Sequence, residues 1–203
     1  MAKKEISTAA AEDKKLRTKD LIYAGAFGAI YIVLMLVVVL GTSMVPILYI
    51  LAPLPVGIVC GTVYELCVLK VHKFGAALIL GVLFALVACS AHPLGMILAV
   101  IAALLAELVI RSGSCKSKKM YLLSFVVFNL NMVCPYTQLY FYRDQFLSLS
   151  ANYYGQAYAD AIAGYANNGL AFLQIALALL GGAIGSFIAS RLISKHFEKA
   201  GII

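Results

Sequence analysis

Charged residues and tryptophan are what this sequence has least of. Only 12% of its 203 residues are Asp, Glu, Lys or Arg, whereas 63% are hydrophobic, and tryptophan is absent. With a mean hydropathy of +0.95, the chain has too little polar surface to cover a water-soluble globule of this size. A soluble fold is therefore excluded, and the sequence predicts an integral membrane protein.

Catalytic and metal-binding motifs are also missing. The sequence contains no HExxH, no GxSxG and no phosphate-cradling GxxxxGK[ST], so we expect no catalytic residues, no metal site, no cofactor bound by this chain and no ATP hydrolysis of its own. The five cysteines form no CxxC pair and are predicted to be buried thiols that act as small hydrophobic side chains. They are Cys60, Cys67, Cys89, Cys115 and Cys134.

Six apolar segments predict an all-α bundle of six transmembrane helices, since one crossing takes about 20 residues. The segments are 20–41, 47–69, 74–89, 93–110, 120–142 and 169–192. The first is too long for the apolar core of a signal peptide and is predicted to be retained. We therefore expect a basic tail over residues 1–19 and one membrane domain over residues 20–203.

Lysine and arginine are unevenly distributed between the apolar segments. One set of gaps receives nearly all of them, and the other set receives only Arg143. Positive charge stays on the cytoplasmic side, so both termini are predicted to be cytoplasmic. Because the basic residues do not form one patch, the net charge of +7 does not predict a nucleic-acid partner, and membrane lipid surrounds the chain instead.

The outward side then consists of two tight turns, 42–46 and 90–93, and one long loop, 143–168. The loop has no lysine, is rich in tyrosine and has helical character over residues 157–163. Its tyrosines are typical of an aromatic belt at the membrane interface. A lid over an outward-facing pocket is the equally weighted alternative, because long loops are often functional.

The fifth segment is the most polar and is our preferred substrate-binding wall. At about 100° per residue, one sector holds Asn129, Tyr136 and Tyr140, and the opposite sector holds Asn131, Gln138 and Tyr142. One sector is expected to line a cavity and the other to bond to neighbouring helices, and the spacing does not say which. Pro135 is expected to loosen or kink this helix.

Two residues outside the fifth segment complete the candidate binding set. Tyr49 lies near the outward mouth and suits either an aromatic belt or a pocket. His92, which precedes a proline at an outward turn, is more typical of a cap than of a ligand. The functional alternative is an axial ligand to a haem-like substrate, with a methionine or a loop tyrosine opposite.

Apart from Asp20, which begins the first segment, the acidic residues inside the apolar segments are Glu65 and Glu107. Both lie near a predicted cytoplasmic end, so we expect them to reach the interface or to pair with Lys70 and Arg111. A proton relay is disfavoured, because it would need an acid nearer the middle of the membrane.

Small residues recur at helical spacing in three segments. Ala24, Gly25, Gly28 and Ala29 share one sector and leave a shallow groove near the cytoplasmic end of the first helix. This groove suits either a partner helix or packing within the chain. Gly57-xxx-Gly61 and Gly181-xxx-Gly185 predict close packing within the bundle.

The start of the first helix carries a family resemblance. Residues 16–31, LRTKDLIYAGAFGAIY, together with a basic tail and six helices with both ends inside, resemble the substrate-binding S component of an energy-coupling factor (ECF) transporter. Within that superfamily the sequence is most similar to the Trep_Strep group. The resemblance implies a subunit, not an enzyme, that captures a vitamin or similar scarce nutrient at the extracellular side.

The resemblance also implies partners. An S component associates with a transmembrane T component and two ATPase subunits, which use ATP, and an AxxxA-like motif on its first helix contacts the T component. The matching positions here are Ala24 and Gly28, or Gly25 and Ala29. The scarcity of outward charges favours a flat or largely apolar ligand, such as a cofactor or haem-like compound. A self-sufficient secondary carrier or small channel is the alternative function.

Overall fold

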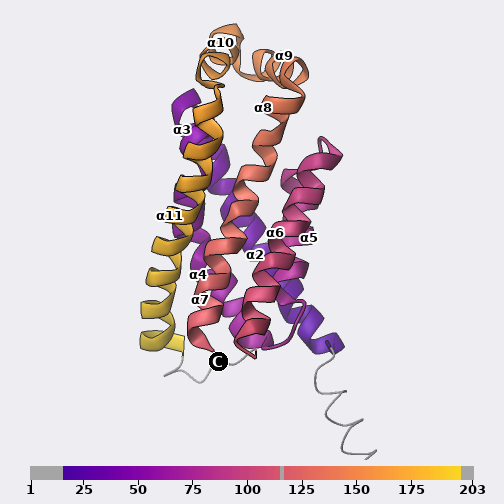
Figure 1. Ribbon diagram of the computed structural model, residues 1–203, viewed down its shortest axis with the longest axis vertical. Coiled ribbons are helices and arrows are strands. Elements are labelled where there is room, and N and C mark those ends of the chain that lie inside the picture. Colours follow the sequence, from indigo (N-terminus) through magenta and orange to yellow (C-terminus); the bar gives the residue numbers. More distant parts are fainter. Residues whose placement is uncertain (1–15, 115–116, 198–203) are drawn as a thin grey trace, which may run out of the picture.

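The computed structural model describes residues 16–114 and 117–197, and its regular elements are all helical. In chain order they are α2 (Thr18–Ser43), α3 (Pro46–Leu51), α4 (Pro53–Val71), α5 (Ala76–Ala88), α6 (Pro93–Ser112), α7 (Lys118–Phe128), η1 (Asn129–Tyr136), α8 (Thr137–Phe141), α9 (Arg143–Tyr154), α10 (Gln156–Tyr165), α11 (Asn168–Leu192) and η2 (Ile193–Phe197). The long helices stand side by side, and α9 and α10 lie across one end of the bundle (Figure 1).

Five stretches of the described residues are long and apolar enough to cross a membrane. They are Thr18–Ser43, Pro53–Val71, Pro93–Ser112, Lys118–Phe141 and Gly169–Lys195. The predicted all-α membrane bundle is therefore confirmed. The third predicted segment forms α5, whose 13 residues span only about 20 Å, less than the ~30 Å of a bilayer core. Six complete crossings thus stay a prediction.

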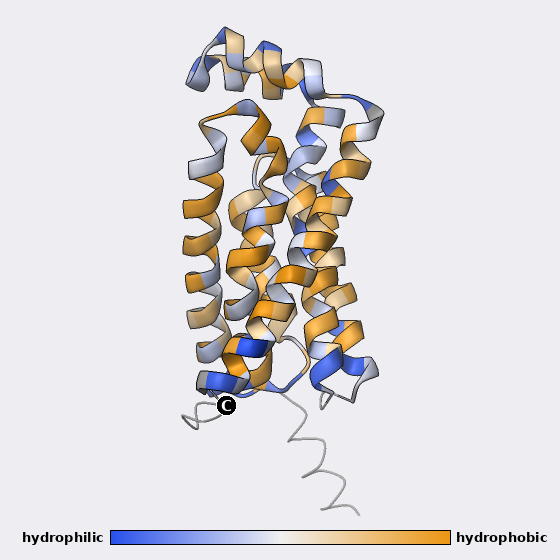
Figure 2. Ribbon diagram, turned by 90° about the vertical axis from the view of Figure 1, so that its left-hand side faces the viewer, coloured by the Kyte–Doolittle hydropathy of each residue, from blue (hydrophilic) through white to orange (hydrophobic). Residues whose placement is uncertain are grey.

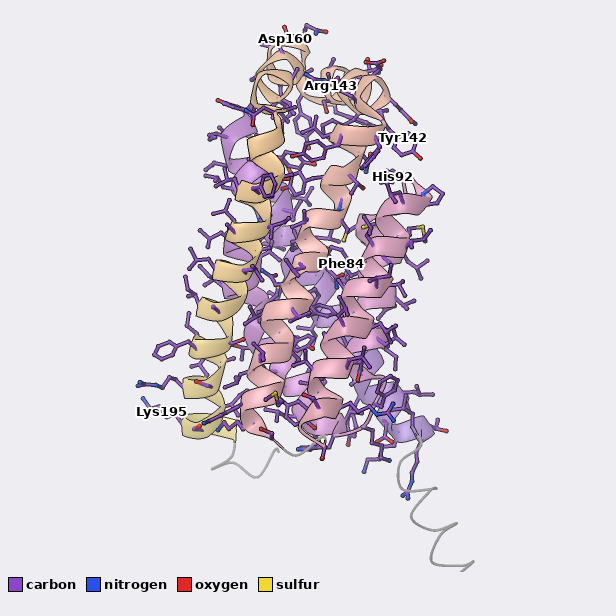
Figure 3. The ribbon with its side chains drawn as sticks, in the orientation of Figure 1. Phe84, His92, Tyr142, Arg143, Asp160 and Lys195 are labelled. Carbon is purple, nitrogen blue, oxygen red and sulfur yellow. The ribbon has the colours of Figure 1, made fainter. Side chains whose placement is uncertain are left out.

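Hydrophilic residues gather at the two ends of the bundle, and hydrophobic residues cover most of its length (Figure 2). Figure 3 shows Lys195 at one end and Arg143 and Asp160 at the other. At the lysine-rich end, the Lys73 ammonium lies 2.8 Å from the Asp20 carboxylate and ties the α4–α5 turn to the start of α2. This separation of charge agrees with the predicted topology, and the cytoplasmic position of the lysine-rich end stays a prediction.

Proline sets several helix boundaries. Pro46, Pro53 and Pro93 each open a helix, because the fixed φ of proline suits the first turn and its missing N–H is not needed there. The second predicted segment is therefore two helices, α3 and α4, rather than one. In the fifth segment Pro135 lies inside the 3₁₀ helix η1, which confirms the predicted loss of regular α-helix.

Glycines bring α4 and α11 into backbone contact. A methyl group added at Gly61 would lie 2.8 Å from the Gly185 carbonyl carbon, and one added at Gly181 would lie 2.6 Å from the Leu54 carbonyl oxygen. At Gly185 an added methyl group would collide with the Gly57 carbonyl oxygen. The predicted role of these glycines in close packing is confirmed.

Aromatic side chains fill the centre of the bundle beside this contact. The ring of Tyr64 lies 5.0 Å from Phe125 and 4.6 Å from Phe128, and Tyr31 meets Phe128 edge-on at 5.7 Å. The Tyr64 hydroxyl lies 3.0 Å from the Ser124 hydroxyl. These contacts join α2, α4 and α7 into one core.

A single methyl group in the α4–α11 contact should destabilise the protein. We expect Gly185→Ala to lower the free energy of unfolding by about 1–3 kcal/mol, because the backbones must separate to admit the methyl group. Thermal unfolding of the full-length protein in detergent measures this. Gly25→Ala is the matched control, since nothing lies within 4 Å of a methyl group there, and it should stabilise α2 by up to about 1 kcal/mol. Equal effects of the two variants would contradict the assigned contact.

Candidate functional site: a cavity beneath α9 and α10

A cavity of about 230 Å³ lies at the end of the bundle that α9 and α10 cover. It is lined by Ser43, Tyr49, Gln138, Phe146, Leu149, Ser150, Tyr153, Tyr154 and Tyr158. Six of these nine residues belong to α9 or α10. The segment predicted as a long loop is therefore two helices, and the helical character predicted over residues 157–163 is confirmed within α10.

Helices α9 and α10 are connected to each other by a tight turn, a ring contact and a hydrogen bond. Gly155, with φ at +91°, makes the sharp turn between α9 and α10, a conformation that suits glycine. Tyr154 and Tyr158 stack across that turn with ring centroids 4.6 Å apart. At the other end of the pair, the Arg143 guanidinium donates a hydrogen bond of 2.9 Å to the Ala163 carbonyl. The two helices are thus joined at both ends.

No side chain that lines this cavity carries a formal charge at neutral pH. The Ser43 hydroxyl donates to the Val39 carbonyl at 2.6 Å, and the Ser150 hydroxyl donates to the Phe146 carbonyl at 2.8 Å. Both hydroxyls therefore offer only lone pairs to a ligand. Burial, reinforced by neighbouring Tyr154, raises the pKa of Tyr158 to about 12, so its phenol stays neutral at physiological pH.

Of the predicted binding residues, Tyr49 and Gln138 line the cavity. The sector of Asn129, Tyr136 and Tyr140 instead bonds to neighbouring helices. Asn129 donates to the Pro53 and Ala178 carbonyls at 3.2 and 2.7 Å, the Tyr136 hydroxyl donates to the Tyr49 carbonyl, and the Tyr140 hydroxyl lies 3.5 Å from the Gln174 amide oxygen. Helical spacing alone did not show which polar sector bonds to neighbouring helices, and these contacts identify the sector of Asn129, Tyr136 and Tyr140.

Asn131 is not among the residues that line the cavity beneath α9 and α10. Its side chain is fully buried, and neither its amide oxygen nor its amide nitrogen has a hydrogen-bond partner among the described residues. The uniform 100° spacing fails here because η1 is a 3₁₀ helix, which turns by about 120° per residue. Asn131 and Gln138 therefore do not share one cavity-lining face.

His92 is held as a cap. Its Nδ1 accepts a hydrogen bond from the Gly95 N–H at 3.2 Å, its Nε2 lies 3.4 Å from the Thr137 hydroxyl, and its ring stacks on Tyr142 at 5.0 Å. Figure 3 shows His92 and Tyr142 close together on neighbouring elements. These contacts fit the cap interpretation, and His92 is not among the residues that line the cavity beneath α9 and α10.

The two membrane acids are not at the interface, which corrects the sequence prediction. Glu65 and Glu107 are both 0% exposed. Glu107 accepts hydrogen bonds from the Ala77 and Leu78 N–H groups at 2.6 and 3.2 Å and so caps α5 from a neighbouring helix. Both carboxylate oxygens of Glu65 lack a hydrogen-bond partner among the described residues. Neither glutamate side chain reaches the membrane interface, because both positions face the inside of the bundle.

The small residues of α2 separate into two pairs. Ala24 and Gly28 are buried, and a methyl group added at Gly28 would lie 2.6 Å from Leu83 of α5. Ala29 is exposed, and a methyl group added at Gly25 would have no atom of the described residues within 4 Å. The first pair therefore serves packing within the chain, and the second pair leaves an open surface.

Helix α9 and the cavity residues on it were not predicted from the sequence, although the spacing of these residues indicates a helix. Phe146, Leu149, Ser150, Tyr153 and Tyr154 recur at intervals of three and four residues, which is typical of one helical face. The polar residues between them hid this pattern. Ser43, at the end of α2, had no signal of its own.

Comparison with known proteins places the chain in a family. A family model described as "Hypothetical bacterial integral membrane protein (Trep_Strep)" matches residues 18–199. The chain belongs to the Trep_Strep family. No curated protein and no solved structure matches it. The cavity beneath α9 and α10 and the open surface of α2 both lie within the matched region of this Trep_Strep protein.

The cap formed by His92 should make this Trep_Strep protein sensitive to acid. Burial lowers the pKa of His92 below its ordinary value of 6.5, so the imidazole is neutral at pH 7 and its Nδ1 can accept the Gly95 N–H. Since the folded-state pKa is the lower one, stability is full above about pH 6.5 and falls as pH decreases through the folded-state value.

We expect the thermal midpoint in detergent to drop between pH 7.5 and pH 5, and to drop less in His92→Asn. Asparagine caps a helix without titrating. The pKa of His72 is lowered as well, and it is present in both proteins, so the difference between them isolates His92. Identical pH profiles would show that His92 is not the sensitive group.

Proposed function

We propose that this multi-pass membrane protein is the substrate-capture S component of an ECF-type importer. It binds a scarce nutrient at the extracellular side and delivers it through a T component and two ATPases. The observation that carries the proposal is the placement of two features at opposite ends of the bundle: a cavity beneath α9 and α10, and the open surface of Gly25 and Ala29 on α2.

The capture site is the cavity beneath α9 and α10. At about 230 Å³ it is smaller than the roughly 300–1,000 Å³ typical of sites for drug-sized ligands. This size and the uncharged lining favour a small, flat or compact molecule over a haem-like macrocycle. Because α9 and α10 supply most of the lining, their displacement would open the site and their return would enclose the ligand.

The partner surface is the open pair on α2. Gly25 and Ala29 let a second helix approach closely, and their apolar neighbours Leu21, Ile22 and Val33 are also exposed. Close approach at small residues is the usual basis of helix association in membranes. The buried pair, Ala24 and Gly28, is already used against α5 and is not proposed as the docking site.

A double substitution on α2 tests the assembly. We expect Gly25→Leu combined with Ala29→Leu to abolish co-purification with the T component and ATPases when all subunits are produced together, because leucine side chains would hold the partner helix away. Gly41→Leu is the matched control, since Gly41 is an open position at the opposite end of the same helix, and it should leave assembly unchanged.

Two results would contradict the proposal. One is unchanged co-purification of the double variant that retains the thermal stability of the wild type. The other is substrate uptake by liposomes that contain this chain alone, which would make it a self-sufficient carrier or channel.

A further inference from the structure

Five of the nine described residues that line the cavity beneath α9 and α10 are aromatic. Tyr49 and Phe146 face each other at 6.3 Å with an angle of 21° between their planes, and Tyr154 and Tyr158 form a second stacked pair. Both pairs, with Tyr153, line the same cavity. Within each pair the facing sides of the rings are turned to each other. Where the other ring faces border the cavity they attract a cation, because each face carries partial negative charge.

The described lining of the cavity offers an anion no positive charge. None of its lining side chains is Lys, Arg or His, and the hydroxyl hydrogens of Ser43 and Ser150 are already used in bonds to backbone carbonyls. A carboxylate or phosphate would lose its water here without gaining an opposite charge, which is costly. The tyrosine hydroxyls and the Gln138 amide can donate hydrogen bonds but carry no charge, so the lining favours a cation over an anion.

The charged residues on the segment that covers the cavity also favour a positively charged ligand. The segment that forms α9, α10 and their connections carries Arg143, Asp144 and Asp160, a net charge of −1. The one basic residue of this set is engaged with the Ala163 carbonyl and does not line the cavity. The local field therefore favours a positive ligand over a neutral ligand of equal shape.

The lining also restricts the type of cation. Neither Asp nor Glu is among the described lining residues, so a primary ammonium, which is strongly hydrated, would exchange its water for neutral acceptors alone and gain no anionic partner. A methylated ammonium or an N-alkylated aromatic ring sheds water easily and fits within about 230 Å³. From these steps we infer that the ligand captured at this site is a small organic cation of the quaternary ammonium or N-alkylated heteroaromatic class. The inference rests on the proposed capture function.

Matched pairs of probes test the charge directly. Calorimetric titration of the full-length protein in neutral detergent would compare choline with its uncharged carbon analogue 3,3-dimethylbutan-1-ol and with the anion 3,3-dimethylbutanoate. N-methylpyridinium would be compared with pyridine at pH 8. We expect at least one of the two cations to bind at least tenfold more tightly than its neutral analogue, and the anion not to bind measurably.

Two tyrosines of similar exposure locate the binding. Tyr154 is 46% exposed and lines the cavity, whereas Tyr165 is 41% exposed and lies outside it. Tyr154→Leu should weaken cation binding at least fivefold, Tyr154→Phe should retain it because the ring face remains, and Tyr165→Leu should leave it unchanged.

The inference is overturned if neither cation binds, if a neutral or anionic probe binds as tightly as its cation, or if Tyr165→Leu weakens binding as much as Tyr154→Leu. If a neutral probe binds and Tyr154→Leu abolishes that binding, the cationic ligand class is rejected and the proposed capture site is kept. If the wild-type protein binds the cation but does not assemble with a T component and ATPases, the proposed S-component function is rejected and the proposed ligand class is kept.

Discussion

The backbone contact between α4 and α11 is the constraint on which the rest of the bundle depends. Inside a membrane, helices gain little from hiding apolar surface, because lipid is as apolar as their side chains, so close packing must supply the attraction. Gly57, Gly61, Gly181 and Gly185 let the two backbones meet. Asn129 lies at the same seam and donates to one carbonyl at the start of α4 and to one on α11. A polar side chain is thereby satisfied where water is absent, and η1 is fixed to both helices.

This seam positions the cavity. Because α4 and α11 are held together, α3, which precedes α4, and α10, which precedes α11, meet at the same end of the bundle (Figure 1). The hydrogen bond from Tyr136 to the Tyr49 carbonyl then ties η1 to α3. The cover formed by α9 and α10 packs on these walls through a small apolar cluster, in which Tyr158 and Ile162 of α10 meet Ile50, Leu139 and Leu170 of the bundle.

Buried polar groups divide into structural and unexplained ones. Glu107 supplies the cap that short α5 cannot make for itself, and His92 caps α6 while contacting α8 and Tyr142. Both side chains connect helices that are separate in sequence, which explains why polar residues persist in these segments. Glu65 and Asn131 are equally buried and have no partner among the described residues, and the structure gives no reason for their polarity.

The sequence by itself determined the class of the protein, because the lack of charge and the length of the apolar segments leave no soluble solution. It also determined the close packing of the glycines, since this follows from their missing side chains, whereas the helix start at Pro53 within the second predicted segment was not predicted. Only the tertiary structure decided which polar face of the fifth segment meets a cavity, because the 3₁₀ stretch changes the angle between successive residues and the neighbouring helices choose the partners. It likewise decided which small pair on α2 is buried, because Gly25 and Gly28 are chemically identical and differ only in whether α5 lies beside them.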